Sequence, residues 1–182
     1  MRFRFNERKA VQAAAYILKL AGGHLSYMVL LKLLYLADRE MLLKHGLTIT
    51  GDTMIAMKHG PTLSRVSDLI HEGPQGAESA WPEYIGEPSN FEVALKKDGP
   101  LDELSRFELG LLKHAYETYG KMDKWALTDL LHRKLPEWKD PGNSCSTIDP
   151  ADILRAESRS DDEIRQVQED AEELWFLGSA TP

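Results

Sequence analysis

The sequence predicts a mainly α-helical, compact single domain over residues 1–182, with about seven helices and two or three short β-strands. Three observations predict this fold class. Apolar residues recur at spacings of three and four along most of the chain. Residues that cap or stop helices stand at the ends of these segments. The segment 27–44 is apolar over most of its circumference, as expected for a central helix that is buried among others.

The first two helices have clear boundaries. One is predicted from Asn6, which can cap it, to Leu20. The central helix is predicted over 27–44, with Ser26 as its cap and Gly46 just beyond its end.

The middle of the chain carries weaker signals. Residues 47–57 are rich in Thr and Ile around a Gly-Asp pair and predict a short hairpin or an extended loop. Pro61, after Gly60, is predicted to start a third helix at its first turn, where the missing N–H costs nothing. Residues 73–90 predict a long surface loop. Residues 91–99 alternate in polarity and predict one strand, whose expected partner is the 47–57 segment.

Capping signals predict four helices in the second half of the chain. Two signals are capping boxes, and two are aspartates that precede helical patterns. They are Ser105 with Glu108, Asp123, Asp149 before Pro150, and Ser160 with Glu163. The last predicts an acidic C-terminal helix over about 160–177.

The composition limits the classes of function. The formal net charge is -7, so we expect no nucleic-acid partner, because an acidic protein repels phosphate. The single cysteine excludes an intrachain disulfide and a thiolate zinc site, and favours a cytoplasmic protein. No secretory leader is recognisable, and the longest apolar run is too short to span a bilayer, so we expect no membrane association.

Two polar groups are candidates for a site. Lys32, Tyr35 and Asp38 recur at i,i+3 along one edge of the central helix. If the turn that contains Lys58 and His59 packs against this edge, a small polar pocket results. The alternative is an amphipathic buried tyrosine beside a solvated edge, and it remains open.

No catalytic or metal-binding motif is recognisable. The sequence lacks a nucleophile elbow, a phosphate-binding loop and an HExxH pattern, and His59 has no partner at metal-ligand spacing. We therefore expect no catalytic residue, no metal and no cofactor. Gly60, Pro61, His132, Pro136 and Trp138 are interpreted as structural residues that form a turn, a helix stop and an aromatic lid on the core.

Five segments, in this order, resemble one known family. They are LLKLLYLADRE (30–40), ITGD (49–52), AMKHGP (56–61), VALKKDGPLDELSRFE (93–108) and YETYGKMDKWALTDLLHRKLPEW (116–138). Together they resemble the Panacea domain of SocA-like antitoxins, and the resemblance extends from about Ala10 to Leu177. Glu137, between Pro136 and Trp138, departs from the family pattern.

The resemblance implies an antitoxin that neutralises a cognate protein toxin by direct binding, without catalysis. The toxin would be encoded by a neighbouring gene, and alarmone-synthetase-like toxins are among those that such domains neutralise. Two alternatives remain: an adaptor that delivers a toxin to a Clp-type protease, and an enzyme that uses a pocket of Tyr35, Asp38 and His59. The residues predicted to bind the partner are Lys32, Tyr35, Asp38, Lys58, His59, Glu169, Glu172, Glu173 and Trp175.

Overall fold

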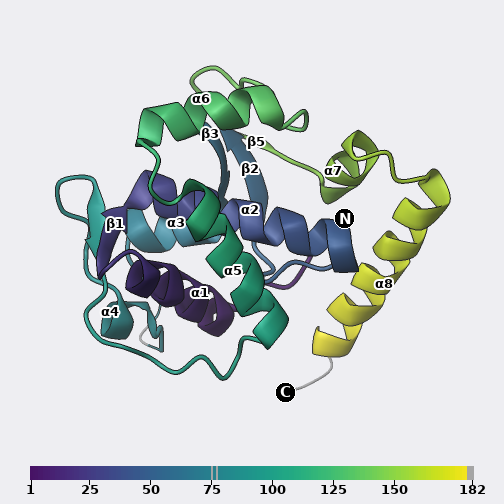
Figure 1. The fold of residues 1–182 in the computed structure, drawn as a ribbon. Coiled ribbons are helices and arrows are strands. Elements are labelled where there is room, and N and C mark those ends of the chain that lie inside the picture. The colour runs from purple at the N-terminus through teal and green to yellow at the C-terminus, as the bar shows by residue number, and fades with distance from the viewer. Residues whose placement is uncertain (75, 77, 180–182) are drawn as a thin grey trace.

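The computed structural model describes residues 1–74, 76 and 78–179, and in these residues it has eight helices and five short strands (Figure 1). The helices are α1 (Glu7–Leu20), α2 (Tyr27–His45), α3 (Ser64–His71), α4 (Trp81–Tyr84), α5 (Arg106–Tyr119), α6 (Lys124–Lys134), α7 (Pro150–Ala156) and α8 (Asp161–Ser179). The strands are β1 (His24–Ser26), β2 (Met54–Met57), β3 (Gly60–Leu63), β4 (Glu92–Ala94) and β5 (Ser146–Thr147). The prediction of a mainly α fold is confirmed, with more strands than expected.

Helix α2 is the centre of the fold (Figure 1). It packs against α1 and α5, against β3, and against α7 near its C-terminal end. Leu30, Leu33 and Leu34 are almost completely buried because neighbours cover the helix on several sides. The prediction of a central, buried apolar helix is therefore confirmed.

The strands form two small antiparallel sheets. One pairs β1 with β4, so that His24 lies opposite Ala94. The other has the order β3-β2-β5. The expected pairing of the 91–99 strand with the 47–57 segment is wrong, because the three-residue strand β1 takes that position. Such a short strand leaves no recognisable alternation in the sequence.

The prediction that Pro61 starts a helix is also wrong. Pro61 lies in β3, opposite Ala56 of β2, and the two strands form a hairpin whose two loop residues are Lys58 and His59. Proline is tolerated in β3 because this is an edge strand, where a missing N–H need not break a ladder. Gly60 has a positive φ of 101°, which a side-chain-bearing residue rarely adopts.

Asp52 provides the cap of α3 that the local sequence lacks. Helix α3 begins at Ser64, and its N-cap residue Leu63 has no side chain that can accept a hydrogen bond. The Asp52 carboxylate instead accepts hydrogen bonds from the backbone N–H groups of Arg65 (3.0 Å) and Val66 (2.9 Å). The cap of α3 is thus supplied from outside the helix, and the helix starts at Ser64 instead of at Pro61 as predicted.

Most of the predicted capping residues make the expected bonds, but Ser26 does not. Ser26 occupies the N-cap position of α2, yet its side chain makes no capping hydrogen bond and its buried hydroxyl has no partner among the described residues. Asn6 accepts from the backbone of Lys9, and Asp123 accepts from the backbone of Trp125 and Ala126. Both capping boxes are present, at α5 and at α8. The long loop predicted over 73–90 contains the short helix α4, which buries Trp81.

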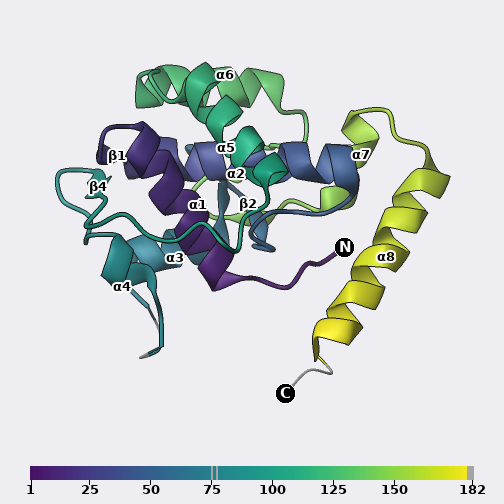
Figure 2. The ribbon, with the colours of Figure 1, turned by 60° about the horizontal axis from the view of Figure 1, so that its bottom comes forward.

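Helix α8 lies at the edge of the molecule, away from α1 and α5 in both ribbon views (Figures 1 and 2). It packs against α7 and buries Ile164 and Ala171. Val167 packs closely on Gly46: a Cβ added to Gly46 would lie 3.0 and 3.2 Å from the two methyl groups of Val167. Among the described residues, no helix is both long enough and apolar enough to cross a membrane.

Candidate partner-binding surface and the pocket beside it

Two of the residues predicted to bind a partner are inside the fold. Tyr35 and Asp38 are each 0% exposed. The Tyr35 hydroxyl donates to Glu137 Oε1 at 2.9 Å, and Asp38 accepts from the backbone N–H groups of Ile49 and Thr50. Because their polar atoms are already used within the chain, the prediction that these two side chains lie on a contact surface does not fit the structure.

Glu137 is the centre of a buried ionic network. Its side chain is 0% exposed, and its carboxylate accepts hydrogen bonds from Arg39 Nε at 2.7 Å and from Arg39 Nη2 at 3.3 Å. Arg39 also reaches Glu157, which is half exposed, at 2.7 Å. Burial opposes the charge on Arg39, but hydrogen bonds to Glu137 and Glu157 outweigh it and raise the pKa of the guanidinium.

The same network affects Tyr35. Burial, followed by the negative charge of Glu137, raises the pKa of the Tyr35 hydroxyl well above its ordinary value. Tyr35 therefore stays protonated and acts as a hydrogen-bond donor. Glu137 departs from the family pattern, and its signal in the sequence is a charged residue between the helix-stopping Pro136 and the aromatic Trp138.

Asp38 is a second buried carboxylate. Burial raises its pKa to about 7, although hydrogen bonds from the Thr50 side chain and from the backbone of Thr50 and Ile49 act in the opposite direction. Its bonds fix residues 49 and 50 at the point where the chain leaves α2 and approaches the hairpin.

The structure brings Lys32 and the Lys58-His59 turn together, which is the condition for a pocket at this edge of α2. The Lys32 ammonium donates to the backbone carbonyl of His59. Gly60 permits this approach, because a Cβ at this position would lie 3.1 Å from Lys32 Nζ and 3.5 Å from His132 Nε2. Burial lowers the pKa of Lys32 to about 8.

His132 and Trp138 attach the hairpin to the end of α6. Their rings stack in parallel with centroids 3.6 Å apart, and the Trp138 indole N–H donates to the carbonyl of Met57 at 3.0 Å. Burial, and then the positive charge of Lys32, lowers the pKa of His132. His132 Nε2 is buried without a hydrogen-bond partner among the described residues. These contacts place both rings in the framework that supports the turn.

An exposed group of aromatic, apolar and basic side chains surrounds the hairpin tip. We call it the hairpin-tip surface and define it as Met57, His59, Phe91, Lys124 and Trp125. Met57 is 41% exposed, Phe91 63% and Trp125 49%. The rings of His59 and Trp125 meet edge to face at 5.3 Å, and Lys124 Nζ lies 4.8 Å from the Phe91 ring and 5.6 Å from the Trp125 ring. Phe91, in the 91–99 segment, and Trp125, at the start of α6, are not among the residues predicted from the sequence to bind a partner.

The backbone at Phe91 is strained. Asn90 and Phe91 have φ values of +50° and +65°, a conformation that side-chain-bearing residues seldom adopt. Each such residue costs on the order of 1–3 kcal/mol. This strain accompanies the exposure of a large aromatic ring.

A pocket of about 250 Å³ lies beside the hairpin, between α2, β3 and α3. Its walls are mainly apolar and include Tyr27, Met28, Leu31 and Met57. The polar side chains that line it are those of Lys32, Lys58, His59, Thr62, Ser67 and His71. The Tyr27 and His71 rings meet edge to face at 5.0 Å.

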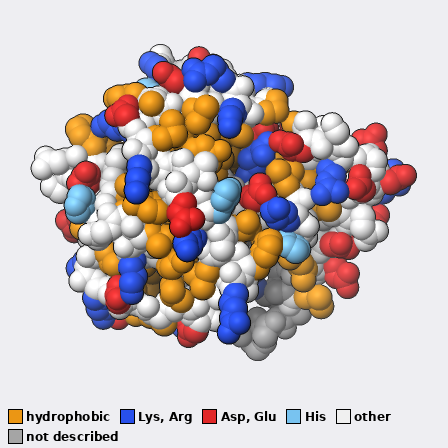
Figure 3. All heavy atoms as spheres, in the orientation of Figure 1, with side chains coloured by type: hydrophobic (Ala, Val, Ile, Leu, Met, Phe, Trp, Pro, Cys, Tyr) orange, Lys and Arg blue, Asp and Glu red, His pale blue; other side chains and the backbone are white. Residues whose placement is uncertain are grey.

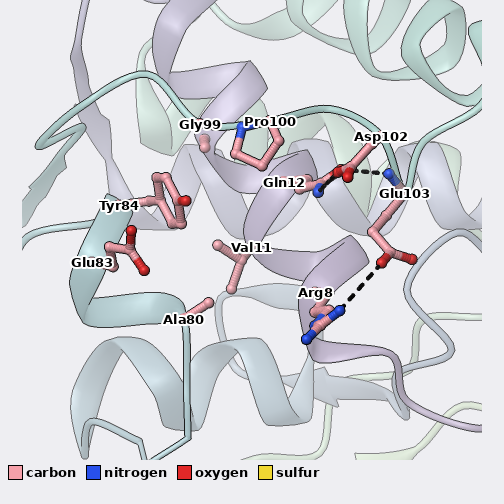
Figure 4. Close-up of a pocket in the computed structure, with 11 residues that line it drawn as sticks. Arg8, Val11, Gln12, Ala80, Glu83, Tyr84, Gly99, Pro100, Asp102 and Glu103 are labelled. Atoms are coloured by element: carbon pink, nitrogen blue, oxygen red, sulfur yellow. Dashed lines mark hydrogen bonds and ion pairs between the residues drawn. The ribbon is translucent and has the colours of Figure 1, made fainter.

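A second pocket, of about 200 Å³, lies between α1, α4 and residues 99–103 (Figure 4). Its polar groups are bonded to each other. Gln12 donates to Asp102 at 2.7 Å and accepts from the backbone of Glu103 at 3.0 Å, while Arg8 pairs with Glu103 at 3.8 Å. These bonds fasten the 99–103 segment to α1, so the pocket has a structural explanation.

The acidic residues predicted on the last helix form a separate group. Glu169, Glu172 and Glu173 are exposed, and acidic side chains gather at the end of the molecule that α8 occupies (Figure 3). Trp175 is half-buried and has the Arg2 guanidinium 4.4 Å from its ring centroid. The predicted binding residues therefore divide between the hairpin tip and α8.

The chain folds as a mainly α-helical domain that exposes large hydrophobic side chains at its surface. Among the described residues, no group of three or more His, Cys, Asp or Glu side chains is placed to hold a metal ion. Residues 30–139, more than half of the chain, match the family described as antitoxin SocA-like, Panacea domain. The chain belongs to this family. Comparisons with curated proteins and with solved structures gave no match.

The matched segment contains the hairpin-tip surface, Lys32 and the buried partners Arg39 and Glu137. Helices α1, α7 and α8 lie outside it. The family thus corresponds to the part of the fold that builds and supports the hairpin.

Proposed function

We propose that this protein is an antitoxin that neutralises a cognate protein toxin by binding it through the hairpin-tip surface. The observation that carries the proposal is the exposure of Met57, Phe91 and Trp125 around one turn, inside the segment that matches the antitoxin family. Neutralisation is stoichiometric, because the toxin is inhibited by occlusion or conformational locking and this chain performs no chemistry.

The physical character of the surface supports a protein partner. Aromatic residues and Met are enriched in the buried centres of protein interfaces, and Trp is a frequent source of binding energy. Trp125 is held against His59, and Lys124 lies over both exposed rings. A surface fixed before binding loses little side-chain entropy when the toxin docks.

Helix α8 is proposed as a second contact. Glu169, Glu172 and Glu173 present negative charge, and Leu174 and Phe176 are 51% and 66% exposed. A toxin with a basic patch would be attracted by this charge, which chiefly increases the rate of association. Replacing the three glutamates by lysine should therefore slow association and weaken binding; unchanged binding would remove α8 from the interface.

The proposal is tested first by co-expression. The gene next to this one is expressed alone and together with this chain, growth is scored, and the two proteins are co-purified. Growth arrest alone, rescue together and a stable complex are expected. A harmless neighbour would contradict the antitoxin role.

The binding surface is tested with Trp125→Ala, using Phe107→Ala as the matched control. Both residues are exposed aromatics on helices, at 49% and 44%, but Phe107 packs edge to face on His45 at 4.6 Å, away from the hairpin. Loss of a central aromatic anchor should cost about 2 kcal/mol or more, a loss of at least tenfold in affinity. Equal affinities for the two variants would refute the surface.

Two further measurements separate the mechanisms. An adaptor for a Clp-type protease predicts that the toxin level falls only in cells that contain the protease, whereas direct binding predicts rescue with the toxin level unchanged. An enzyme that uses His59 predicts that His59→Ala abolishes rescue although the complex still forms. Direct binding predicts that rescue and complex formation weaken together.

A further inference from the structure

The pocket beside the hairpin contains a buried cation with unused hydrogen-bonding capacity. Lys32 is only 4% exposed, and its ammonium donates to the His59 carbonyl. An ammonium has three N–H donors, and a buried charge is costly unless it is paired. A carbonyl dipole neutralises none of the charge. The pocket thus has room for an anion beside a cation that needs one.

A second buried polar group lines the same pocket. Thr62 is 5% exposed, and its hydroxyl oxygen is buried without a hydrogen-bond partner among the described residues. Alternate residues of a strand face the same way, so Thr62 lies on the side of β3 on which Gly60 faces Lys32. Buried hydroxyls are normally bonded, so this group requires an explanation.

The apolar walls of the pocket determine the size and polarity of the rest of the ligand. Tyr27, Met28, Leu31 and Met57 make the lining mainly apolar. The volume of about 250 Å³ lies just below the range of about 300–1,000 Å³ that is usual for pockets of drug-sized ligands. It suits a group the size of one amino-acid residue.

We propose that this pocket binds the carboxylate of a small apolar acid, with Lys32 and Thr62 donating to the carboxylate oxygens and the apolar walls receiving the rest. One buried ammonium balances one carboxylate. The other lysine of the lining, Lys58, is exposed, whereas a phosphate dianion would require more cationic or backbone donors at the depth of Lys32; the arginine fork that suits phosphate is not among the lining residues. The inference concerns a ligand site and does not depend on the antitoxin role.

The chemistry is tested by NMR titration of the purified full chain with N-acetyl-leucine, its neutral counterpart N-acetyl-leucinamide, and inorganic phosphate. N-acetyl-leucine is expected to shift the amide signals of Gly60 and Thr62, with an affinity on the order of millimolar for so small a probe. The amide and phosphate are expected to bind at least tenfold more weakly. Equal binding of the amide, equal binding of phosphate, or absence of binding by the acid would each overturn the proposal.

Two substitutions test the assigned donors. Lys32→Met should abolish binding of N-acetyl-leucine, but it also removes the bond to the hairpin. Thr62→Val avoids that difficulty because it preserves shape and removes only an unbonded hydroxyl. It is expected to weaken binding about tenfold, as for the loss of one hydrogen bond to a charged group, while the free protein becomes no less stable.

Thr128→Val is the matched control for Thr62→Val. Thr128 is 4% exposed, and its hydroxyl donates to the Lys124 carbonyl at 2.8 Å. This variant should lose stability and keep its affinity for the acid, the opposite of the expectation for Thr62→Val. If Thr62→Val binds the acid as tightly as the unaltered protein, the assignment of Thr62 is refuted.

The same chemistry has two possible sources, and competition distinguishes them. If the toxin supplies the carboxylate, for example on an apolar C-terminal residue, N-acetyl-leucine will displace the toxin and removal of that residue will weaken the complex. If a free metabolite supplies it, the acid will bind the toxin complex as well as the free protein. Either result retains the carboxylate site.

Discussion

Replacing Glu137 by glutamine tests whether the buried ionic network holds the fold together. The substitution preserves the size of the side chain but removes its charge. Arg39, whose side chain is 10% exposed, then keeps only the half-exposed Glu157 as an anionic partner. In addition, the new amide places a donor where Arg39 Nη2 now donates to Oε2.

The expected cost follows from this geometry. Breaking a buried ion pair by removing one partner costs about 3–5 kcal/mol, and we expect the lower end because Glu157 still neutralises part of the charge. With a urea m-value of about 2–3 kcal/mol/M, the unfolding midpoint should fall by about 1–1.5 M. The melting temperature should fall by about 6–12 °C.

Glu157→Gln is the control, because it makes the same chemical change to the other partner of Arg39. The Glu157 side chain is 46% exposed, so its ion pair is expected to contribute about 0–1 kcal/mol. Urea unfolding followed by circular dichroism measures both variants. The reasoning is refuted if the midpoint of Glu137→Gln lies within about 0.3 M of that of Glu157→Gln, which corresponds to less than about 1 kcal/mol.

Three further predictions concern single residues. Burial raises the pKa of Asp38 from 3.8 to about 7, so protonated Asp38 stabilises the fold, and this contribution to the free energy of unfolding is lost as the pH rises through that interval. As the pH is raised from 4 to 8, Asp38→Asn should therefore gain stability relative to the unaltered protein. A difference in melting temperature that stays constant across this range would contradict the assignment. Gly60→Ala should cost about 1 kcal/mol more than Gly23→Ala, because the two glycines have similar φ values of +101° and +103° but only at Gly60 would the added Cβ crowd neighbouring atoms, with Lys32 Nζ nearest at 3.1 Å; equal melting temperatures would contradict the crowding. Asp52→Ala should destabilise the protein by about 1–2 kcal/mol because α3 loses its cap, and urea unfolding that matches the unaltered protein would show that the cap is dispensable.

Helices whose ends are marked by adjacent residues could be predicted from the sequence. Asn6, Ser105 and Asp123 each bond the backbone two or three residues further on, so the signal and the structure share one short window. Pro61 was misassigned because proline fits both the first turn of a helix and an edge strand. The choice between them depended on pairing with Ala56 and on a cap from Asp52, and neither contact is visible in a local pattern.

The candidate site likewise has a part that the sequence could indicate and a part that it could not. The sequence left open whether the turn at Lys58 and His59 packs against the edge that carries Lys32, and the hydrogen bond from Lys32 to the His59 carbonyl shows that it does. Glu137 could not be found in this way, because its partners Tyr35 and Arg39 lie about a hundred residues away in the chain. Its local context indicates only the end of a helix.

The polar edge of α2 positions the candidate surface from within. Lys32 holds the hairpin tip, Tyr35 and Arg39 hold Glu137, and Asp38 holds residues 49 and 50. Together these four residues fix three separate segments of the chain to one buried helix.

This arrangement links the buried network to the surface. Glu137 precedes Trp138, which stacks on His132 and bonds the carbonyl of Met57 in the hairpin. Under the proposed function, a change at Glu137 should therefore displace the tip and weaken binding of the toxin, although Glu137 is itself buried. In that proposal Glu137 acts as a positioning residue, whereas the exposed Phe91 and Trp125 are the contacts.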